Sequence, residues 1–303
     1  MSEGAENAGS KKSSDDPWTV LRLLEWTTDF FKSRGSESAR LDAEVLLAHA
    51  RDCERIELYT AFGEVPDEEQ RVAFREMVRR RGEGTPVAQL VGYREFYSMK
   101  FRVDENVLIP RPETEHLVIE ALDRVKAMKV DHPLQVADIG TGSGAIAISI
   151  AKHAKSVEVT AVDRSPAALK IAIWNADKLK AGSALRFIES DLLQGVDEPQ
   201  KFDIICSNPP YVSELEFAEL SATVRDYEPK EALVSGAEGT EVIERLLNEC
   251  PDRLQPGGRL IIELSPMIAD ACESLVLASD AFTDLKFIKD LEGHRRILSV
   301  QRN

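Results

Sequence analysis

The sequence predicts an α/β protein with a doubly wound, mostly parallel, seven-stranded sheet and a smaller helical region before it. Two observations lead to this fold class. From Leu134 onward, apolar strand-like runs alternate with helical segments, whereas residues 18–81 carry helical periodicity alone. Runs that alternate in this way are typical of parallel strands whose two faces are covered by crossover helices.

Seven apolar runs are the strand candidates. Helical segments such as residues 165–181 separate most of the first five, which favours parallel crossover connections. The last two runs lie close together, so one of them is expected to be antiparallel. The predicted strands are residues 134–140, 157–163, 185–190, 202–208, 258–264, 285–290 and 295–300.

The region before the sheet reads as about three short helices in a small bundle. Leu41, Val45 and Ala48 recur at helical spacing and are expected to share one buried face. Another helix is expected to start at Asp67, with Gln70 completing a capping box, and to stop at Gly82. The predicted division is a disordered tail over 1–17, a helical domain over 18–85, a β-hairpin linker over 86–111 and an α/β domain over 112–303.

The linker prediction rests on an alternating pattern. Tyr97, Met99, Phe101 and Val103 fall on one face of an extended segment, residues 104–106 supply a turn, and an apolar run resumes at Val107. A helix is then expected after Pro112, because proline suits the first turn and acidic residues follow it.

Composition excludes several classes of protein. The 303 residues suffice for two domains, and the net charge of −15 disfavours duplex nucleic acid as the main partner, since phosphate recognition needs a basic face. The four cysteines and five histidines show no metal-ligand or redox spacing, so we expect no metal, and a reducing compartment. No apolar stretch reaches the length of a membrane span, and the polar start is not a targeting signal.

Three successive strand ends carry residues suited to a nucleotide-like cofactor. Gly140, Gly142 and Gly144 follow the first strand in a G-x-G-x-G pattern, which permits a tight turn and close approach of a ligand to the backbone. Asp163 ends the second strand, where a carboxylate can accept hydrogen bonds from ribose hydroxyls, and Asp191 follows the third. Because ligands of open α/β sheets bind outside the carboxyl ends of the strands, these groups are expected to converge.

The fourth strand ends in "SNPPY", and with these motifs the sequence from Leu134 onward resembles class I S-adenosylmethionine-dependent methyltransferases that modify an amide or exocyclic amine nitrogen. A longer match narrows the resemblance to the release-factor glutamine methyltransferase family, which modifies the GGQ glutamine of class-1 peptide chain release factors. This match runs through "LDAEVLLAHA", "RRRGEGTPVAQLVG", "GYREFYSMKFRVDENVLIPRPETEHLV", "EPKEALVSGAEGTEVI", "LQPGGRLIIEL" and "DLEGHRRIL".

The resemblance implies a Rossmann-like domain that binds S-adenosylmethionine. Gly140 to Gly144, with Thr141 and Ser143 between the glycines, would wrap the methionyl end, Asp163 would bind the ribose, and Asp191 and Leu192 would border the adenine. Many relatives carry an aromatic residue where Leu192 stands, so adenine stacking is expected to be weaker here. Relatives also often have Gly and Gln where this chain has Ser265 and Met267.

The tetrapeptide from Asn208 to Tyr211 is expected to hold a planar NH2 group. An amide nitrogen is a poor nucleophile because its lone pair is delocalised, so its orientation toward the methyl donor matters most. The Asn208 side-chain carbonyl and the Pro209 backbone carbonyl can accept its two N–H groups. Pro210 and Pro209 stiffen the turn, and Tyr211 offers a flat wall. The cofactor-binding and catalytic sets therefore share Asn208.

The resemblance also implies that the helical domain recognises the release factor and that the enzyme is bacterial and cytoplasmic, because eukaryotic cytosolic relatives lack this domain. No direct nucleic-acid contact and no membrane partner are expected. Three alternatives stay open: a glutamine methyltransferase acting on a ribosomal protein, a DNA adenine-N6 methyltransferase and a non-catalytic binding module. The charge of −15 counts against the second, and the intact Asn208 and Asp163 count against the third.

Overall fold

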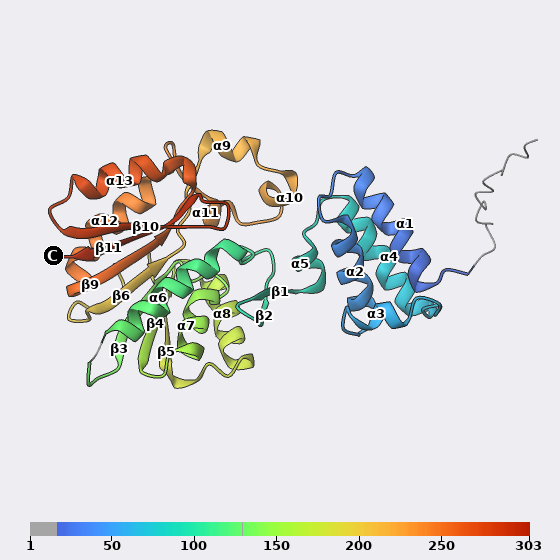
Figure 1. Ribbon diagram of the computed structural model, residues 1–303, viewed down its shortest axis with the longest axis horizontal. Coiled ribbons are helices and arrows are strands. Elements are labelled where there is room, and N and C mark those ends of the chain that lie inside the picture. Colours follow the sequence, from blue (N-terminus) through green and yellow to red (C-terminus); the bar gives the residue numbers. More distant parts are fainter. Residues whose placement is uncertain (1–16, 129) are drawn as a thin grey trace, which may run out of the picture. The chain divides into compact units, whose positions relative to one another are not determined.

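The computed structural model describes residues 17–128 and 130–303, so all but the last residue of the tail predicted over 1–17 lies outside the described chain. The chain divides into two compact units, and the division falls between Val91 and Gly92 (Figure 1). Each unit has its own buried apolar residues. Within the described residues, no helix is long and apolar enough to cross a membrane.

The first unit is helical, with five helices in its described part where the pattern suggested about three. The predicted capping box is confirmed, since the Asp67 side chain accepts from the Gln70 N–H at 2.8 Å and the Gln70 side chain accepts from the Asp67 N–H at 3.2 Å. The helices are α1 (Val20–Ser33), α2 (Ala39–Ala50), α3 (Glu57–Thr60), α4 (Glu68–Gly82) and α5 (Val87–Val91).

The buried face of α2 differs from the predicted one. Ala48 is buried as expected, but Leu41 is 44% exposed. Ala43, Leu46 and Leu47 are fully buried instead, and their spacing of three and four residues places them on one side of the helix. The prediction for Leu41 was wrong because two apolar stripes run along this helix and the periodicity could not choose between them.

The hairpin is present, but its turn lies elsewhere. β1 (Tyr93–Phe96) pairs antiparallel with β2 (Met99–Arg102), so Tyr97 and Ser98 form the turn, not residues 104–106. Both turn residues have positive φ, +49° and +60°, as a two-residue turn with the twist of a hairpin requires. Glycine or asparagine usually marks such a turn, and neither is present to signal it.

The hairpin is also not a separate linker. Phe96 and Phe101 are fully buried in an apolar cluster of the second unit, and Glu115 of α6 (Glu115–Ala127) accepts from the Tyr97 N–H at 2.8 Å. The second unit therefore begins at Gly92 instead of residue 112, and α5 of the first unit occupies part of the predicted linker.

The second unit contains all seven predicted strands in one sheet, of order β10-β11-β9-β6-β3-β4-β5. Ladders join β5 to β4, β4 to β3, β3 to β6 and β6 to β9 in parallel, whereas β11 runs antiparallel to both of its neighbours, which confirms the expected exception. The strands are β3 (Leu134–Ile139), β4 (Val157–Asp163), β5 (Leu185–Glu189), β6 (Phe202–Ser207), β9 (Leu254–Glu263), β10 (Phe282–Lys289) and β11 (Arg295–Arg302).

Helices cover both faces of this sheet (Figure 1). α6, α7 and α8 pack on one face, and α12 and α13 on the other, so alternate residues of the central strands point into two separate apolar clusters. The remaining elements of this unit are η1 (Pro112–Thr114), α7 (Ala145–His153), α8 (Pro166–Lys178), η2 (Gly182–Ala184), β7 (Val212–Ser213), α9 (Glu214–Glu219), α10 (Ala222–Arg225), α11 (Lys230–Leu233), β8 (Val234–Gly236), α12 (Glu241–Arg253), η3 (Pro266–Ile268) and α13 (Ala269–Leu277).

The strand order creates a point where the winding direction reverses. The chain passes from β3 outward to β4 and β5, and then crosses back to β6 on the other side of β3. Loops that leave the carboxyl ends of β3 and β6 therefore turn in opposite directions and leave a crevice between them. The four strand ends predicted to carry function, those of β3, β4, β5 and β6, border this crevice.

Candidate active site

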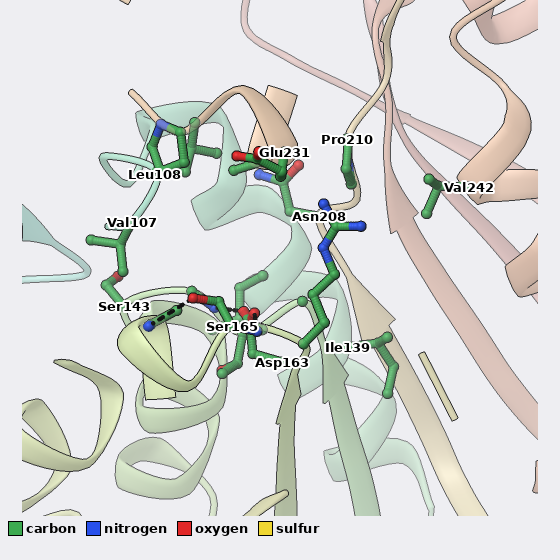
Figure 2. Close-up of a pocket in the computed structure, with 18 of the residues that line it drawn as sticks. Val107, Leu108, Ile139, Ser143, Asp163, Ser165, Asn208, Pro210, Glu231 and Val242 are labelled. Atoms are coloured by element: carbon green, nitrogen blue, oxygen red, sulfur yellow. Dashed lines mark hydrogen bonds between the residues drawn. The ribbon is translucent and has the colours of Figure 1, made fainter. Parts of the chain in front are cut away.

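A pocket of about 420 Å³ opens at these strand ends, within the range of about 300–1,000 Å³ typical of ligand sites. The structure brings most predicted site residues together there, and Figure 2 shows Ser143, Asp163 and Asn208 among the side chains around it. The predicted residues that line the pocket are Gly140, Thr141, Gly142, Ser143, Asp163, Asp191, Leu192, Asn208 and Pro210. Gly144, Pro209 and Tyr211 are not among its lining residues.

The glycine-rich loop turns sharply between β3 and α7. Gly140 and Gly142 have φ of +73° and +55°, and a Cβ at Gly140 would meet nothing in the described chain within 4 Å beyond its neighbours. Gly144 serves a different purpose. A Cβ there would stand 2.8 Å from Ile148 Cδ1 and 3.2 Å from Ala172 Cβ, so this glycine allows α7 and α8 to approach closely.

Asp163 ties the glycine-rich loop to the end of β4. Its Oδ2 accepts from the Gly142 N–H at 2.8 Å and its Oδ1 accepts from the Ser165 N–H at 2.9 Å (Figure 2). Burial raises the pKa of this carboxyl group, and these backbone donors oppose the rise. Each carboxylate oxygen keeps a second lone pair, so Asp163 can also accept from ribose hydroxyls at the pocket wall.

A second carboxyl group, Asp138, lies beneath the loop and was not among the predicted site residues. It is fully buried, and its Oδ2 accepts from Thr141 Oγ1 at 2.6 Å and from the Ala147 N–H at 3.0 Å. Burial raises its pKa to about 7. Asp138 thus holds the loop against the start of α7, a role that its place within an apolar strand could have suggested.

The residues that follow the third strand lie at the pocket as predicted, but their side chains differ from the expected arrangement. Asp191 lines the pocket but pairs with Arg245 of α12 at 2.8 Å, and Leu192 adopts a φ of +50° beside it. Arg245 also lines the pocket and was missed, because nothing local in α12 distinguishes it from other surface arginines. The aliphatic Leu192 offers a cofactor base an apolar edge, not a stacking ring.

Asn208 is held by a residue far away in the sequence. Its Nδ2 donates to Thr114 Oγ1 at 3.2 Å, although the two residues are 94 positions apart. Its Oδ1 is buried and has no hydrogen-bond partner among the described residues. An unpaired buried carbonyl is costly, so this atom is suited to accept a hydrogen bond from a bound group.

The rest of the tetrapeptide is less exposed to the pocket than predicted. Pro210 lines it, whereas Pro209 is buried. The Tyr211 hydroxyl points toward Glu263 at the end of β9, with 3.5 Å between the hydroxyl and Oε1, and its ring packs on the apolar cluster beneath α12. Burial raises the pKa of the Tyr211 phenol well above its ordinary value. Ser265 and Met267, the two departures that the resemblance implied, also do not line the pocket.

Two loops from outside the sheet complete the pocket, and sequence reasoning missed their contribution. Glu228 joins them: its carboxylate accepts from the Ile109 N–H at 3.1 Å and pairs with Arg111 at 2.6 Å. Its side chain is 1% exposed, and the segments on either side supply pocket walls through Val107, Leu108, Pro110, Pro229, Glu231 and Ala232 (Figure 2). Both segments belong to stretches that supported the family resemblance, "LIPRPE" and "EPKEAL". The sequence did not show that the two stretches lie side by side in the fold.

The pocket fits S-adenosylmethionine in its size, its glycine-lined wall and its strand-end carboxylate. Across residues 17–128 and 130–303, no group of three or more His, Cys, Asp or Glu side chains is arranged to hold a metal ion. A doubly wound sheet with this loop, an acid after β4 and an asparagine-proline turn after β6 defines a class I S-adenosylmethionine-dependent methyltransferase.

Comparisons with known proteins agree with this class. Residues 22–92 match the model of the PrmC N-terminal domain, and residues 118–225 match the methyltransferase small domain. A release factor glutamine methyltransferase of Rhodopirellula baltica is 62% identical over 294 residues, which cover 97% of this chain and 99% of the relative. A relative of the same name from Koribacter versatilis is 40% identical, with 92% and 97% covered. The chain belongs to the release factor glutamine methyltransferase family.

A solved structure supports the fold independently. The hMettl16 catalytic domain resembles this chain with a TM-score of 0.53 and 13% identity, over 75% of this chain and 81% of that one. At this level of identity the likeness concerns the arrangement of strands and helices alone.

Replacing Asp163 with alanine is expected to weaken S-adenosylmethionine binding by about 1–3 kcal/mol, or roughly fivefold to 150-fold, the usual scale for hydrogen bonds to a charged group. The variant would lose the acceptor for ribose and would release the Gly142 N–H. Calorimetric titration measures the effect. Glu158→Ala, which removes an exposed carboxylate from the start of the same strand, is the control. Equal affinities of Asp163→Ala and wild type would remove Asp163 from the site.

Proposed function

We propose that this protein transfers a methyl group from S-adenosylmethionine to the side-chain amide nitrogen of the glutamine in the GGQ motif of class-1 peptide chain release factors. The observation that carries the proposal is the buried Oδ1 of Asn208, which has no hydrogen-bond partner among the described residues and belongs to a pocket shared with the glycine-rich loop. The substrate is supported by relatives of that name that match nearly the full chain.

The residues of the site would act on the side-chain amide nitrogen of the target glutamine, which is a weak nucleophile. The cofactor supplies an already electrophilic sulfonium methyl, so no activated serine, cysteine or histidine is needed. Asn208 Oδ1 and the Pro209 carbonyl would accept the two N–H groups of the target amide and turn its nitrogen toward the donor. The same acceptors stabilise the positive charge that grows on this nitrogen. The loops around Val107 and Glu231 would exclude water.

The proposed partner is the release factor as an intact protein, in the bacterial cytoplasm, without direct contact to nucleic acid or membrane. The first unit, α1 to α5, would recognise the folded factor, since every residue that lines the pocket lies between Asn106 and Arg245 in the second unit. The net charge of −15 agrees with a protein partner better than with a polyphosphate.

A side-by-side methylation assay tests the proposal. The wild-type enzyme and labelled S-adenosylmethionine are incubated separately with intact release factor, the same factor with the GGQ glutamine replaced by alanine, ribosomal proteins and duplex DNA. Label on the glutamine of the intact factor, and none on its alanine variant, is the expected result by mass spectrometry. Faster labelling of DNA or of a ribosomal protein would overturn the substrate assignment.

A further inference from the structure

A buried asparagine in α8 joins two segments that border the pocket. Asn175 is fully buried, and its helix neighbours Ala172 and Ala176 are buried and apolar. A polar amide at such a depth is costly unless its donors and acceptor are paired. Asn175 does not itself line the pocket, so its place in the core needs a separate explanation.

The Asn175 side chain makes three hydrogen bonds, all to backbone groups of other segments. Its Oδ1 accepts from the Arg102 N–H at 2.7 Å, and its Nδ2 donates to the Arg102 carbonyl at 3.1 Å and to the Ser143 carbonyl at 2.8 Å. Because a backbone N–H can only donate, the Arg102 N–H decides which end of the amide is the oxygen. The acceptor and the NH2 group of Asn175 are thus both engaged.

The two segments that Asn175 holds form different parts of the pocket. Ser143 belongs to the glycine-rich loop and lines the pocket. Arg102 is the last residue of β2, and we call the chain that follows it, residues 103–110, the wall segment. Val107 and Leu108 of the wall segment line the same pocket (Figure 2). One side chain therefore connects the glycine-rich loop to the start of the wall segment.

The wall segment is held at both of its ends. At its start, Asn175 pairs with the Arg102 backbone, and the Arg102 guanidinium lies over the ring of Trp174 at 5.2 Å from the ring centroid. Near its other end, Glu228 accepts from the Ile109 N–H at 3.1 Å. Asn175 also bonds the glycine-rich loop, so a shift of that loop is passed to the wall segment at its Arg102 end.

We propose that Asn175 is a positioning residue for cofactor binding, which couples the glycine-rich loop to β2 and the wall segment. The inference rests on the methyltransferase class of the pocket and does not depend on which acceptor is methylated. An apolar side chain in its place would leave the buried Ser143 carbonyl without this donor. Pocket walls that are held in register beforehand cost less to order when the ligand binds, so Asn175 would raise the affinity for S-adenosylmethionine without touching it.

Two variants of α8 in the full-length chain separate this role from packing. Asn175→Leu removes all three hydrogen bonds at similar side-chain shape. Ile171→Ala is the control, because Ile171 is buried one turn earlier in the same helix and contributes apolar packing. Calorimetric titration should give a Kd for S-adenosylmethionine about tenfold higher or more in Asn175→Leu, and within about twofold of wild type in Ile171→Ala. Equal affinities of the two variants would reduce Asn175 to packing.

Hydrogen exchange measures the coupling itself and begins with the wild-type enzyme. The hairpin, residues 93–102, contains no residue that lines the pocket, so it can respond to the cofactor only through its neighbours. Saturating S-adenosylmethionine is expected to slow amide exchange about threefold or more both in residues 140–144 and in the hairpin. In Asn175→Leu the protection of residues 140–144 should persist and that of the hairpin should disappear, whereas Ile171→Ala should keep both.

Two results would overturn the coupling: a wild-type hairpin whose exchange does not respond to the cofactor, or equal protection of the hairpin in Asn175→Leu and wild type. Neither calorimetry nor hydrogen exchange includes a methyl acceptor. Failure of the proposed function is therefore seen separately, as wild-type enzyme that binds S-adenosylmethionine but leaves the release factor unlabelled.

Discussion

Replacing Asn208 with alanine is expected to lower the turnover number for release-factor methylation by about 100- to 1,000-fold, the range seen when one preorganised transition-state contact is removed. Its Oδ1 is buried and has no hydrogen-bond partner within residues 17–128 and 130–303. Alanine removes the contact that orients the target amide and that stabilises charge on its nitrogen. Initial rates at saturating cofactor and release factor measure the effect.

The fold should survive this change. Asn208 contributes one 3.2 Å hydrogen bond to Thr114, so thermal unfolding should change little compared with the loss of turnover. Asn248→Ala removes the same side chain from an exposed position of α12 that does not line the pocket, and it serves as the matched control. A near wild-type rate for Asn208→Ala would refute the role of Asn208 as acceptor.

The strand ends of the site could be predicted because their signals are local. Each strand is a short apolar run, and the residue that follows it is placed at the sheet edge by chain continuity. Asp163 and Asn208 therefore reach the pocket whichever helices pack on the sheet. That one of the last two strands is antiparallel followed in the same way from the short connection between β10 and β11.

Gly144 shows the limit of such local patterns. It stands in the glycine-rich loop with φ of +82°, as a ligand-wrapping glycine would. Its missing side chain, however, makes room for Ala172 of α8. Glycine is required both where a ligand approaches the backbone and where a neighbouring helix does. The sequence alone therefore cannot distinguish the two causes, whereas the packed structure can.

The support behind the site could not be predicted, because it joins distant segments. Thr114 accepts a hydrogen bond from Asn208, 94 positions later in the sequence, and Arg111 donates to Glu228, 117 positions later. Neither pair shows periodicity or spacing that a single sequence reveals. The available local signals were two carboxylates in otherwise apolar strands, Asp138 within β3 and Glu263 at the end of β9, since such groups are seldom buried.

Removing the first unit is expected to reduce kcat/KM for intact release factor by about a hundredfold or more, equivalent to about 3 kcal/mol of lost binding energy. A chain that begins at Gly92 keeps both apolar clusters of the second unit and every residue that lines the pocket. Its affinity for S-adenosylmethionine should therefore stay close to that of the full chain. Calorimetric titration and methylation of intact factor, run on both chains, measure the two effects.

A short GGQ peptide tests whether the first unit recognises the release factor or only stabilises the second unit. The peptide presents the target glutamine but lacks the remote surface of the factor, so it should be a poor substrate for the full chain and for the shortened chain alike. If the first unit recognises the folded factor, its removal lowers the rate on intact factor toward the rate on peptide and leaves the peptide rate unchanged. If the full chain methylates peptide and intact factor equally well, the first unit contributes no recognition. A shortened chain that loses cofactor binding as well would show that α1 to α5 stabilise the second unit.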